Sequence, residues 1–338
     1  MNARIAAILV VLLVVLGGVA LLAQREDRAQ RPQNAATLGQ PLLRDLKAAD
    51  IAKIRIVEPK STLTLERKQD GWVIAEREGF PADFAKVREF VVKMVGLKIA
   101  QSEPIGEKDR ARLNLDSSTA TQLEFAGADG KPLANLLVGR KLFRAEPENP
   151  ERAPGDGRFV LLPADDKTVY MVSDPLVQAT AKTAVWIDRR SFQIEKVKTL
   201  EVRYPGGASW RLERAGDNAP WKLAGLKSGE QVDSSKANAA TYSLGLLDLA
   251  DVAPKDASPE ATGLDKPIRL GATTLSGLAY VVRVGKLEGE NYYVKLESGG
   301  AEKDQLLAQH VLLIPKSRLE DTLKKRAELV EKKKDTRK

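Results

Sequence analysis

The chain has 338 residues, a formal net charge of +8, no cysteine and a single histidine, His310. The lack of cysteine excludes disulfides, thiolate metal sites and a lipidated cysteine, and a lone histidine excludes a histidine-rich metal site within one chain. Ten Lys/Arg and five Asp/Glu fall between Lys316 and Lys338, so most of the excess charge is in a terminal tail and we expect no nucleic-acid binding.

An uncharged apolar run extends from Ile5 to Ala23. As a helix it would measure roughly 28 Å at ~1.5 Å per residue, close to the ~30 Å core of a bilayer. It predicts a transmembrane anchor over residues 1–24, in contact with membrane lipid. The alternative is a cleaved signal peptide, but such a peptide has a shorter apolar region and a small-x-small cleavage site, so the run favours an uncleaved anchor.

The charges around the run do not fix its orientation. Arg4 precedes it, and the three arginines that follow it are partly offset by Glu26 and Asp27. A very short stub before a signal-like helix usually stays in the cytoplasm. We therefore expect a single-pass bacterial inner-membrane protein whose soluble part is periplasmic, joined to its anchor by a polar linker over residues 25–41.

Two segments, residues 42–190 and 191–330, carry similar short motifs in the same order at nearly constant separation. Each begins with a strand of alternating apolar and polar residues, followed by a hairpin whose second strand starts at a tryptophan. The paired motifs are Leu65-Glu66-Arg67 with Leu212-Glu213-Arg214, and Trp72 with Trp221. This order predicts an internal duplication.

A helix is expected next in each copy. Asp83 precedes the first, whose apolar positions from Phe84 to Val95 recur at helical spacing. Asp233 precedes the second, which we expect to extend through Tyr242 to Leu247. An aspartate at such a start accepts bonds from the free N–H groups of the first turn.

The remainder of each copy predicts an antiparallel meander and a closing helix. The strands expected in the first copy are 122–125, 133–139, 158–162 and 168–172, and those in the second are 268–270, 278–285, 292–296 and 311–314. Ser173-Asp174-Pro175 is typical of a helix start, and Ser317 with Glu320 has capping-box spacing. The expected fold class is α+β, with mostly antiparallel sheets.

Four features of the chain carry a family likeness: the anchor, the Leu-Glu-Arg…Gly-Trp hairpin, the Gly-Leu-Asp segment at Gly263, and the Val-Gly-Arg/Lys strand ends at Gly139 and Gly285. In these features the chain resembles a bacterial family of domains of unknown function. The likeness spans Leu42–Leu329, although Leu113-Asn114-Leu115-Asp116 departs from the pattern. Its members are usually membrane-anchored and often duplicated, and some are encoded beside, or fused to, components of ABC-type transport systems, including the auxiliary subunit associated with gliding motility. The resemblance implies an envelope location and a membrane-complex partner, and supplies no catalytic residue or cofactor.

Few residues are candidates for a site. Trp72 and Trp221 favour a buried core role over an exposed stacking platform. Asp116 and Asp265 read as turn or cap residues, with a shared cation site as the alternative. His310 is expected at a strand edge, with membership of a catalytic triad as the alternative; no G-x-S-x-G sequence accompanies it.

The tail from Leu319, with Leu323, Ala327 and Val330 near helical spacing, predicts a basic amphipathic helix followed by a basic end over residues 331–338. That helix would dock on the second domain or attract anionic lipid or an acidic partner. No phosphate loop, dinucleotide fingerprint or zinc-protease helix occurs. We therefore expect a non-enzymatic accessory subunit of an ABC-type transport complex, without cofactor or metal. An extracytoplasmic ligand-binding module and a hydrolase of envelope polymers are the alternatives.

Overall fold

The computed structural model describes residues 37–332, except 144, 146, 154, 190 and 300–303. The expected anchor, most of the linker and the end of the basic tail lie outside the described residues. No helix within the described part of the chain is long and apolar enough to cross a membrane. Contacts divide the chain into two compact units, the first formed by the chain up to Thr62 with Arg88–Ala181 and the second by Leu63–Val87 with the chain from Lys182.

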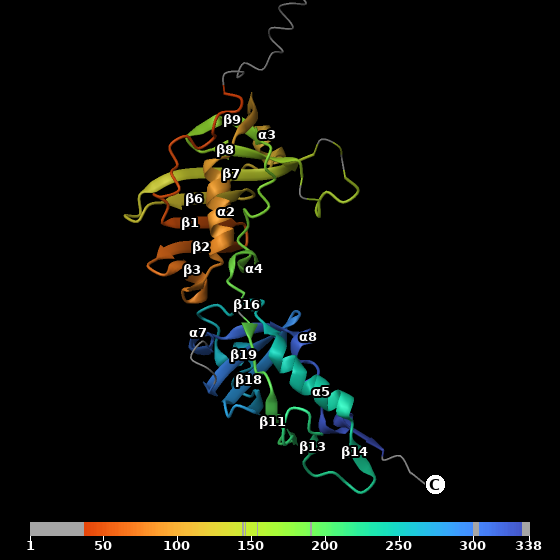
Figure 1. Cartoon of the computed structure of the whole chain (residues 1–338). Coiled ribbons are helices and arrows are strands. Elements are labelled where there is room, and N and C mark those ends of the chain that lie inside the picture. The colour runs from red at the N-terminus through yellow and green to blue at the C-terminus, as the bar shows by residue number, and fades with distance from the viewer. Residues whose placement is uncertain are drawn as a thin grey trace, which may run out of the picture. The chain divides into compact units, whose positions relative to one another are not determined.

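The first sheet has nine strands in the order β4-β3-β2-β1-β6-β7-β8-β9-β5 (Figure 1). Its strands are β1 (Lys53–Glu58), β2 (Ser61–Lys68), β3 (Gly71–Ile74), β4 (Phe80–Pro81), β5 (Ile99–Pro104), β6 (Thr121–Ala126), β7 (Pro132–Leu142), β8 (Gly157–Leu162) and β9 (Asp165–Val172). Alternation along β1 buries Ile54 and Ile56 on one face, as the sequence predicts. Both predicted hairpins of the first copy form, β2 with β3 and β6 with β7, and both are antiparallel.

Helix α2 (Phe84–Val95) lies across one face of this sheet (Figure 1). The Asp83 carboxylate accepts hydrogen bonds from the N–H groups of Ala85 and Lys86, which confirms the predicted helix start. Phe90 is fully buried and stacks on Phe125 of β6 with 6.3 Å between ring centroids. The helix therefore covers the apolar face that the alternating strands create.

The second sheet has eight strands in the order β13-β12-β11-β17-β18-β19-β20-β16. Its strands are β11 (Val197–Arg203), β12 (Ser209–Glu213), β13 (Lys222–Leu223), β16 (Asp251–Val252), β17 (Ile268–Thr274), β18 (Ala279–Glu288), β19 (Asn291–Gly299) and β20 (Leu312–Pro315). Two short pairs accompany it: β10 (Ser191–Phe192) with β15 (Leu247–Asp248), and β14 (Glu230–Val232) with β21 (Val330–Lys332). The α+β class with antiparallel sheets is thus the observed architecture.

Helix α5 (Ser234–Tyr242) begins where the sequence predicts, with the Asp233 carboxylate accepting from the N–H of Lys236. It is shorter than expected. A 3-10 turn, η2 (Ser243–Leu246), follows it, and Leu247 already belongs to β15. The other helical segments are η1 (Ala75–Arg77), α3 (Glu107–Arg112), α4 (Thr183–Trp186), α6 (Pro259–Thr262), α7 (Gln305–Gln309), α8 (Lys316–Leu319) and η4 (Arg326–Leu329).

Strands β3, β2, β1, β6, β7, β8, β9 and β5 follow one another in the first sheet in the same sequence as β13, β12, β11, β17, β18, β19, β20 and β16 in the second. One close approach also recurs. A Cβ on Gly139 would lie 2.3 Å from the carbonyl oxygen of Leu113, and a Cβ on Gly285 would lie 2.2 Å from that of Thr262. Only glycine fits such a contact.

The helix start predicted at Ser173-Asp174-Pro175 is wrong. The Asp174 carboxylate accepts a bond from the N–H of Leu176, two residues on, and Leu176 has a φ of 48°. That left-handed turn prevents a helix from propagating. The next helical turn is α4, at Thr183.

The basic tail does not form the predicted amphipathic helix. Helix α8 begins after Pro315 rather than at a Ser317 cap and ends at Leu319. The chain then turns through η4, buries Leu329 completely and pairs Val330 with Val232 in the β14–β21 ladder. Pairing with a distant strand offsets the local helical preference.

Candidate binding groove

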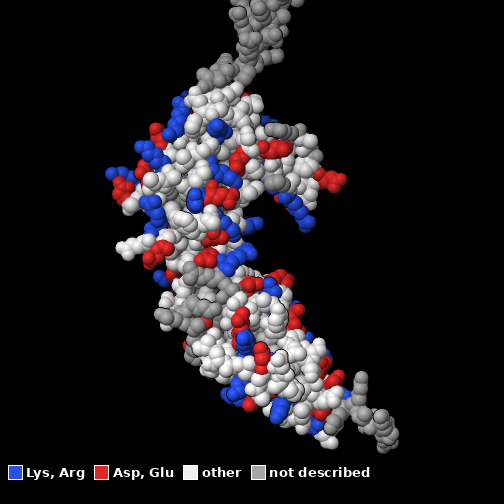
Figure 2. All heavy atoms as spheres, in the orientation of Figure 1, with Lys and Arg blue, Asp and Glu red and all other residues white. Residues whose placement is uncertain are grey.

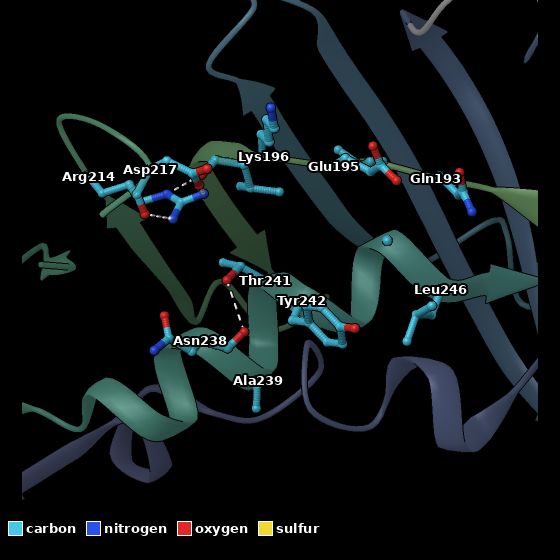
Figure 3. A pocket seen from close by; sticks show the side chains of 13 residues that line it. Gln193, Glu195, Lys196, Arg214, Asp217, Asn238, Ala239, Thr241, Tyr242 and Leu246 are labelled. Carbon is cyan, nitrogen blue, oxygen red and sulfur yellow. Dashed lines mark hydrogen bonds and ion pairs between the residues drawn. The ribbon is translucent and has the colours of Figure 1, made fainter. Parts of the chain in front are cut away.

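A groove of about 680 Å³ lies beside helix α5 in the second unit (Figure 3). One wall is segment 193–197, which leads into β11 and bends at Lys196 (φ 50°), and the opposite wall is formed by α5 and η2. Arg214 and Asp217, from the turn after β12, lie at one end. We call this site the α5 groove; its α5 and η2 residues are Asn238, Ala239, Thr241, Tyr242, Gly245 and Leu246.

Two large side chains line the α5 groove without being covered. Tyr242 is 73% exposed and Leu246, four residues further on, is 36% exposed. Between them, a Cβ added to Gly245 would meet no atom within 4 Å. The floor includes Ile194 and Val197, which are both buried. An exposed aromatic and an exposed aliphatic side chain over a buried apolar floor form a surface suited to binding.

Arg214 and Trp221 form a fixed end to the α5 groove. The Arg214 guanidinium lies 4.7 Å from the centre of the Trp221 ring, donates from Nε to the Val197 carbonyl at 2.7 Å and pairs with Asp217 at 3.0 Å. Trp221 in turn donates from Nε1 to Asn238 Oδ1 at 2.8 Å. These contacts lock the β12 turn against α5, so the end of the groove is held in shape.

The charges that line the α5 groove balance. Lys196 and Arg214 contribute two cations, and Glu195 and Asp217 contribute two anions. Arg214 is neutralised by Asp217, whereas Glu195 and Lys196 form no ion pair within the described residues. In Figure 3 the Asp217 carboxylate faces Arg214, and Glu195 lies on the other side of Lys196. The groove therefore carries no net charge that would select a charged ligand.

The first unit holds a comparable groove beside helix α2, of about 630 Å³. Its lining residues, the α2 groove, are Glu89, Val92, Lys93, Gly96, Leu97, Lys98, Ser173 and Asp174. Here the chain itself spans the helix face, because Lys93 Nζ donates to Gln178 Oε1 at 2.8 Å and Gln178 Nε2 donates to Glu89 Oε1 at 2.8 Å. Lys93 also pairs with Asp174 at 3.5 Å. The loop after β9 is therefore fastened across α2.

Both predicted core tryptophans are buried, Trp72 at 8% and Trp221 at 7% exposure. Trp72 also lines a smaller pocket with the exposed Phe84. Asp116 lies in a turn, where its carbonyl accepts from Thr119 and Ala120, and Asp265 is exposed after α6. No group of three or more acidic, histidine or cysteine side chains within the described ranges is placed to hold a metal.

His310 ends helix α7 just before β20 and is buried, inside the second unit. Its ring meets Phe80 edge to face at 5.1 Å, and its Nδ1 lies 3.5 Å from Glu78 Oε2 without meeting hydrogen-bond geometry. Burial lowers the pKa of His310 and the nearby Lys295 ammonium adds to this effect, while the Glu78 carboxylate opposes it. Its environment is that of a packed core histidine at the edge of β20.

Charged side chains of both signs are interspersed over the face of the molecule in Figure 2. The sequence pattern includes Tyr242 among the apolar positions of the second helix, whereas the structure leaves this residue 73% exposed. A signal was present in the sequence: Asn238 and Gly245 lie four residues before and three residues after Tyr242, at helical spacing. A polar and a small residue on the same face as a tyrosine indicate an open face rather than a packed one.

The fold is of the α+β class with antiparallel sheets. Residues 72–267 match the family model described as Domain of unknown function (DUF4340), and that span includes every residue of the α5 groove. Because the match covers more than half of the chain, the protein belongs to this family. No curated protein and no solved structure matches the chain.

Proposed function

We propose that the protein is a non-enzymatic accessory subunit of an ABC-type transport complex, acting by protein binding. The anchor over residues 1–24 would hold it in the bacterial inner membrane, with the soluble part in the periplasm. The observation that carries the binding role is the α5 groove, where Tyr242 and Leu246 remain exposed over a buried apolar floor. Tyrosine is enriched at protein interfaces because its ring offers a large contact area at little entropic cost.

Support for a transport complex comes from the family resemblance of the hairpin and strand-end motifs, which extend beyond the groove. The electrostatics of the α5 groove favour binding over hydrolysis. Asp217 is engaged by Arg214 at 3.0 Å, and Glu195 does not face it in Figure 3. A glycosidase needs two carboxylates that flank one bond, which is a different arrangement.

We also propose that segments 42–190 and 191–330 are copies of one ancestral unit. The shared strand order of the two sheets supports this. So does the equivalence of Gly139 and Gly285, each against a carbonyl of the segment before β6 or β17. Asn114 and Gly263, which follow those carbonyls, both have positive φ, 53° and 71°. A shared backbone conformation that only some residues tolerate is harder to reach by chance than a shared dipeptide.

The accessory role is tested by purifying the full-length protein in mild detergent from its native host and identifying co-purifying proteins by mass spectrometry. We expect an ABC-type ATPase or permease above the background of a control that carries only residues 1–41 fused to an unrelated soluble domain. Recovery of the same proteins with that control would assign the association to the anchor alone. Recovery of no transporter component from folded, intact material would reject the proposal.

A second candidate is an extracytoplasmic small-ligand module. Its support is the size of the α5 groove, since about 680 Å³ lies within the ~300–1,000 Å³ range of small-molecule pockets. A small ligand would raise the thermal midpoint of the purified protein, and the Gly245→Leu variant would lose that shift. Protein binding remains the leading proposal because Tyr242 is turned so largely to solvent.

A further inference from the structure

We propose that a basic pocket at the end of β7 binds a phosphate monoester, whose phosphate group pairs with Arg140 and whose organic part packs on two phenylalanines. The basic pocket has a volume of about 300 Å³ and lies in the first unit, where the end of α3 meets β7 and β8. Its cations are Arg112, Arg140 and Lys141, and its aromatic side chains are Phe143 and Phe159. The site is separate from the α5 groove, so the proposal does not depend on a transport partner.

The positive charges of the basic pocket are only partly balanced. Within the described residues no carboxylate lines the pocket, and the exposed Arg140 side chain has no hydrogen bond or ion pair. Lys141 Nζ donates to three main-chain carbonyls of loop 150–153, which solvate its charge without neutralising it. Arg112 pairs with Asp109 at 3.2 Å, but both side chains are more than half exposed. A dianion would balance the two charges that remain, and a phosphate monoester carries about −1.5 to −2 at pH 7.

A neighbouring pair of cations adds to this imbalance. Lys141 lies directly opposite Arg158 in the β7–β8 ladder, and like charges in such a position destabilise a sheet. Arg158 is partly buried, its Nε has no hydrogen-bond partner among the described residues, and burial lowers the pKa of its guanidinium. An anion held by Arg140 beside this pair would reduce the cost of keeping both charges.

The corresponding ladder of the second unit shows that the fold does not need these two cations. The ladders β7–β8 and β18–β19 both shift register after the Val-Gly dipeptide of the longer strand. At the next paired position Leu287 lies opposite Tyr292, where the first unit has Lys141 opposite Arg158. A neutral pair therefore completes the same ladder.

The position of Arg112 gives the same result. Arg112 and Ala261 each precede the residue whose carbonyl contacts the close-packed glycine of β7 or β18. Only Arg140 has a basic counterpart, Lys286, which also follows that glycine directly. Cations that gather at this place in one unit and not in the other point to a ligand that the first unit alone binds.

The two phenylalanines supply an apolar wall for the organic part of the ligand. Phe159 packs against the buried cluster that includes Leu113 and Leu161, so its ring is held in place. Phe143 follows β7 directly and is partly buried. An arginine fork beside fixed aromatic rings suits a phosphate attached to a small apolar or aromatic group.

The test measures binding of phenyl phosphate to the full-length protein in phosphatidylcholine nanodiscs by isothermal titration calorimetry. We expect phenyl phosphate to bind more tightly than benzoate, which has one negative charge, and benzyl alcohol to show no binding. Arg140→Gln should weaken phenyl phosphate binding about tenfold or more. It keeps the main-chain N–H that donates to the Leu113 carbonyl, so the fold is preserved. Lys286→Gln, at the corresponding place in the second unit, is the matched control and should bind as the parent does.

Nanodiscs that contain phosphatidic acid, itself a phosphate monoester, distinguish the two sources of the ligand. Loss of phenyl phosphate binding in these discs, together with its return in plain phosphatidylcholine, would assign the site to a lipid headgroup. Unchanged binding would assign it to a free ester.

The thermal unfolding midpoint of each ligand-free variant checks that it folds as the parent does. Absence of phenyl phosphate binding, equal binding of benzoate or benzyl alcohol, or undiminished binding by a folded Arg140→Gln variant would overturn the proposal. None of these results bears on the accessory role, because co-purification of a transporter is measured independently.

Discussion

Gly139 on β7 and Leu113 after α3 approach so closely that no side chain fits between them. A Cβ on Gly139 would lie 2.3 Å from the Leu113 carbonyl oxygen, and that oxygen is held by a 2.8 Å hydrogen bond from the N–H of Arg140. The carbonyl cannot move aside without losing its partner. Gly139 thus fixes the segment 113–116 against β7.

We predict that Gly139→Ala destabilises the protein by about 2–3 kcal/mol, because the added methyl overpacks a backbone contact. Gly285→Ala should do the same, since its Cβ would lie 2.2 Å from the Thr262 carbonyl oxygen. Denaturant midpoints measure the effect. Gly271→Ala on β17 is the control; its Cβ meets nothing within 4 Å, and the change should be neutral or stabilising by up to about 1 kcal/mol. Equal midpoints for all three variants would contradict the close approach.

The contact between Arg214 and Trp221 gives a second prediction. Arg214→Lys keeps the charge but loses the planar fork that stacks on Trp221 and donates to Val197. With the Arg214 side chain only 12% exposed, we expect a loss of about 1–3 kcal/mol in unfolding free energy. Arg211→Lys, on β12 three residues before Arg214 and about half exposed, should change it by less than about 0.5 kcal/mol. Similar effects of both changes would assign no special role to the stacked arginine.

The elements that depend on local pattern could be predicted from the sequence. Val87, Phe90, Val91 and Met94 recur at helical spacing and are all buried on α2, and Trp72 and Trp221 are buried at equivalent hairpins. The errors arose where distant contacts decide. Val330 pairs with Val232, almost a hundred residues earlier, and no local signal in the tail reports that partner.

The α5 groove contains one feature that the sequence predicts and one that it does not. Its helix start at Asp233 follows from local capping chemistry. Its exposed face does not follow from apolar content, because the aromatic Tyr242 is 73% exposed while the neighbouring Thr241 is buried. The opposite wall is segment 193–197, which meets the helix through a bond from the N–H of Ile194 to the Leu244 carbonyl. Periodicity within one segment cannot report such a meeting.

Glu230 and Arg326 join β14 to the C-terminal segment, and their pairing gives a third prediction. Arg326 Nη2 donates to Glu230 Oε2 at 2.7 Å and the N–H of Lys227 donates to the same oxygen at 2.9 Å, which lowers the pKa of Glu230 from 4.5 to about 2. A carboxyl with a lowered pKa in the folded state stabilises it above pH 4.5, and this contribution is lost as the pH falls towards 2.

We expect NMR titration of the Glu230 carboxyl to show that low pKa, and Arg326→Gln to return it towards 4.5. Limited proteolysis should cut the segment after Leu323 faster in Arg326→Gln than in the parent, because the β14–β21 pair is held less firmly. The Arg211–Glu213 ion pair is longer, at 3.6 Å, and both side chains are about half exposed, so it contributes little. Arg211→Gln therefore serves as the control and should leave proteolysis unchanged. A Glu230 pKa near 4.5 in the parent would contradict the pairing.

The single histidine provides the last prediction. Burial against Phe80 lowers the pKa of His310, Lys295 acts in the same direction and Glu78 acts against it. The folded state therefore binds the proton less readily than the unfolded chain. Stability is complete above pH 6.5, the ordinary value, and falls as the pH drops below it.

Because the chain has one histidine, its ring C–H resonance can be followed by NMR without assignment. We expect a midpoint below 6.5 in the folded protein. Unfolding free energy measured between pH 8 and 5 should decline in the parent and decline less in His310→Gln, which cannot take up the proton. Glu78→Gln removes the opposing carboxylate, so it should lower the midpoint further and steepen the decline. A rise of the midpoint in Glu78→Gln would show that the carboxylate does not favour the protonated ring, and would separate burial from charge as the cause of the shift.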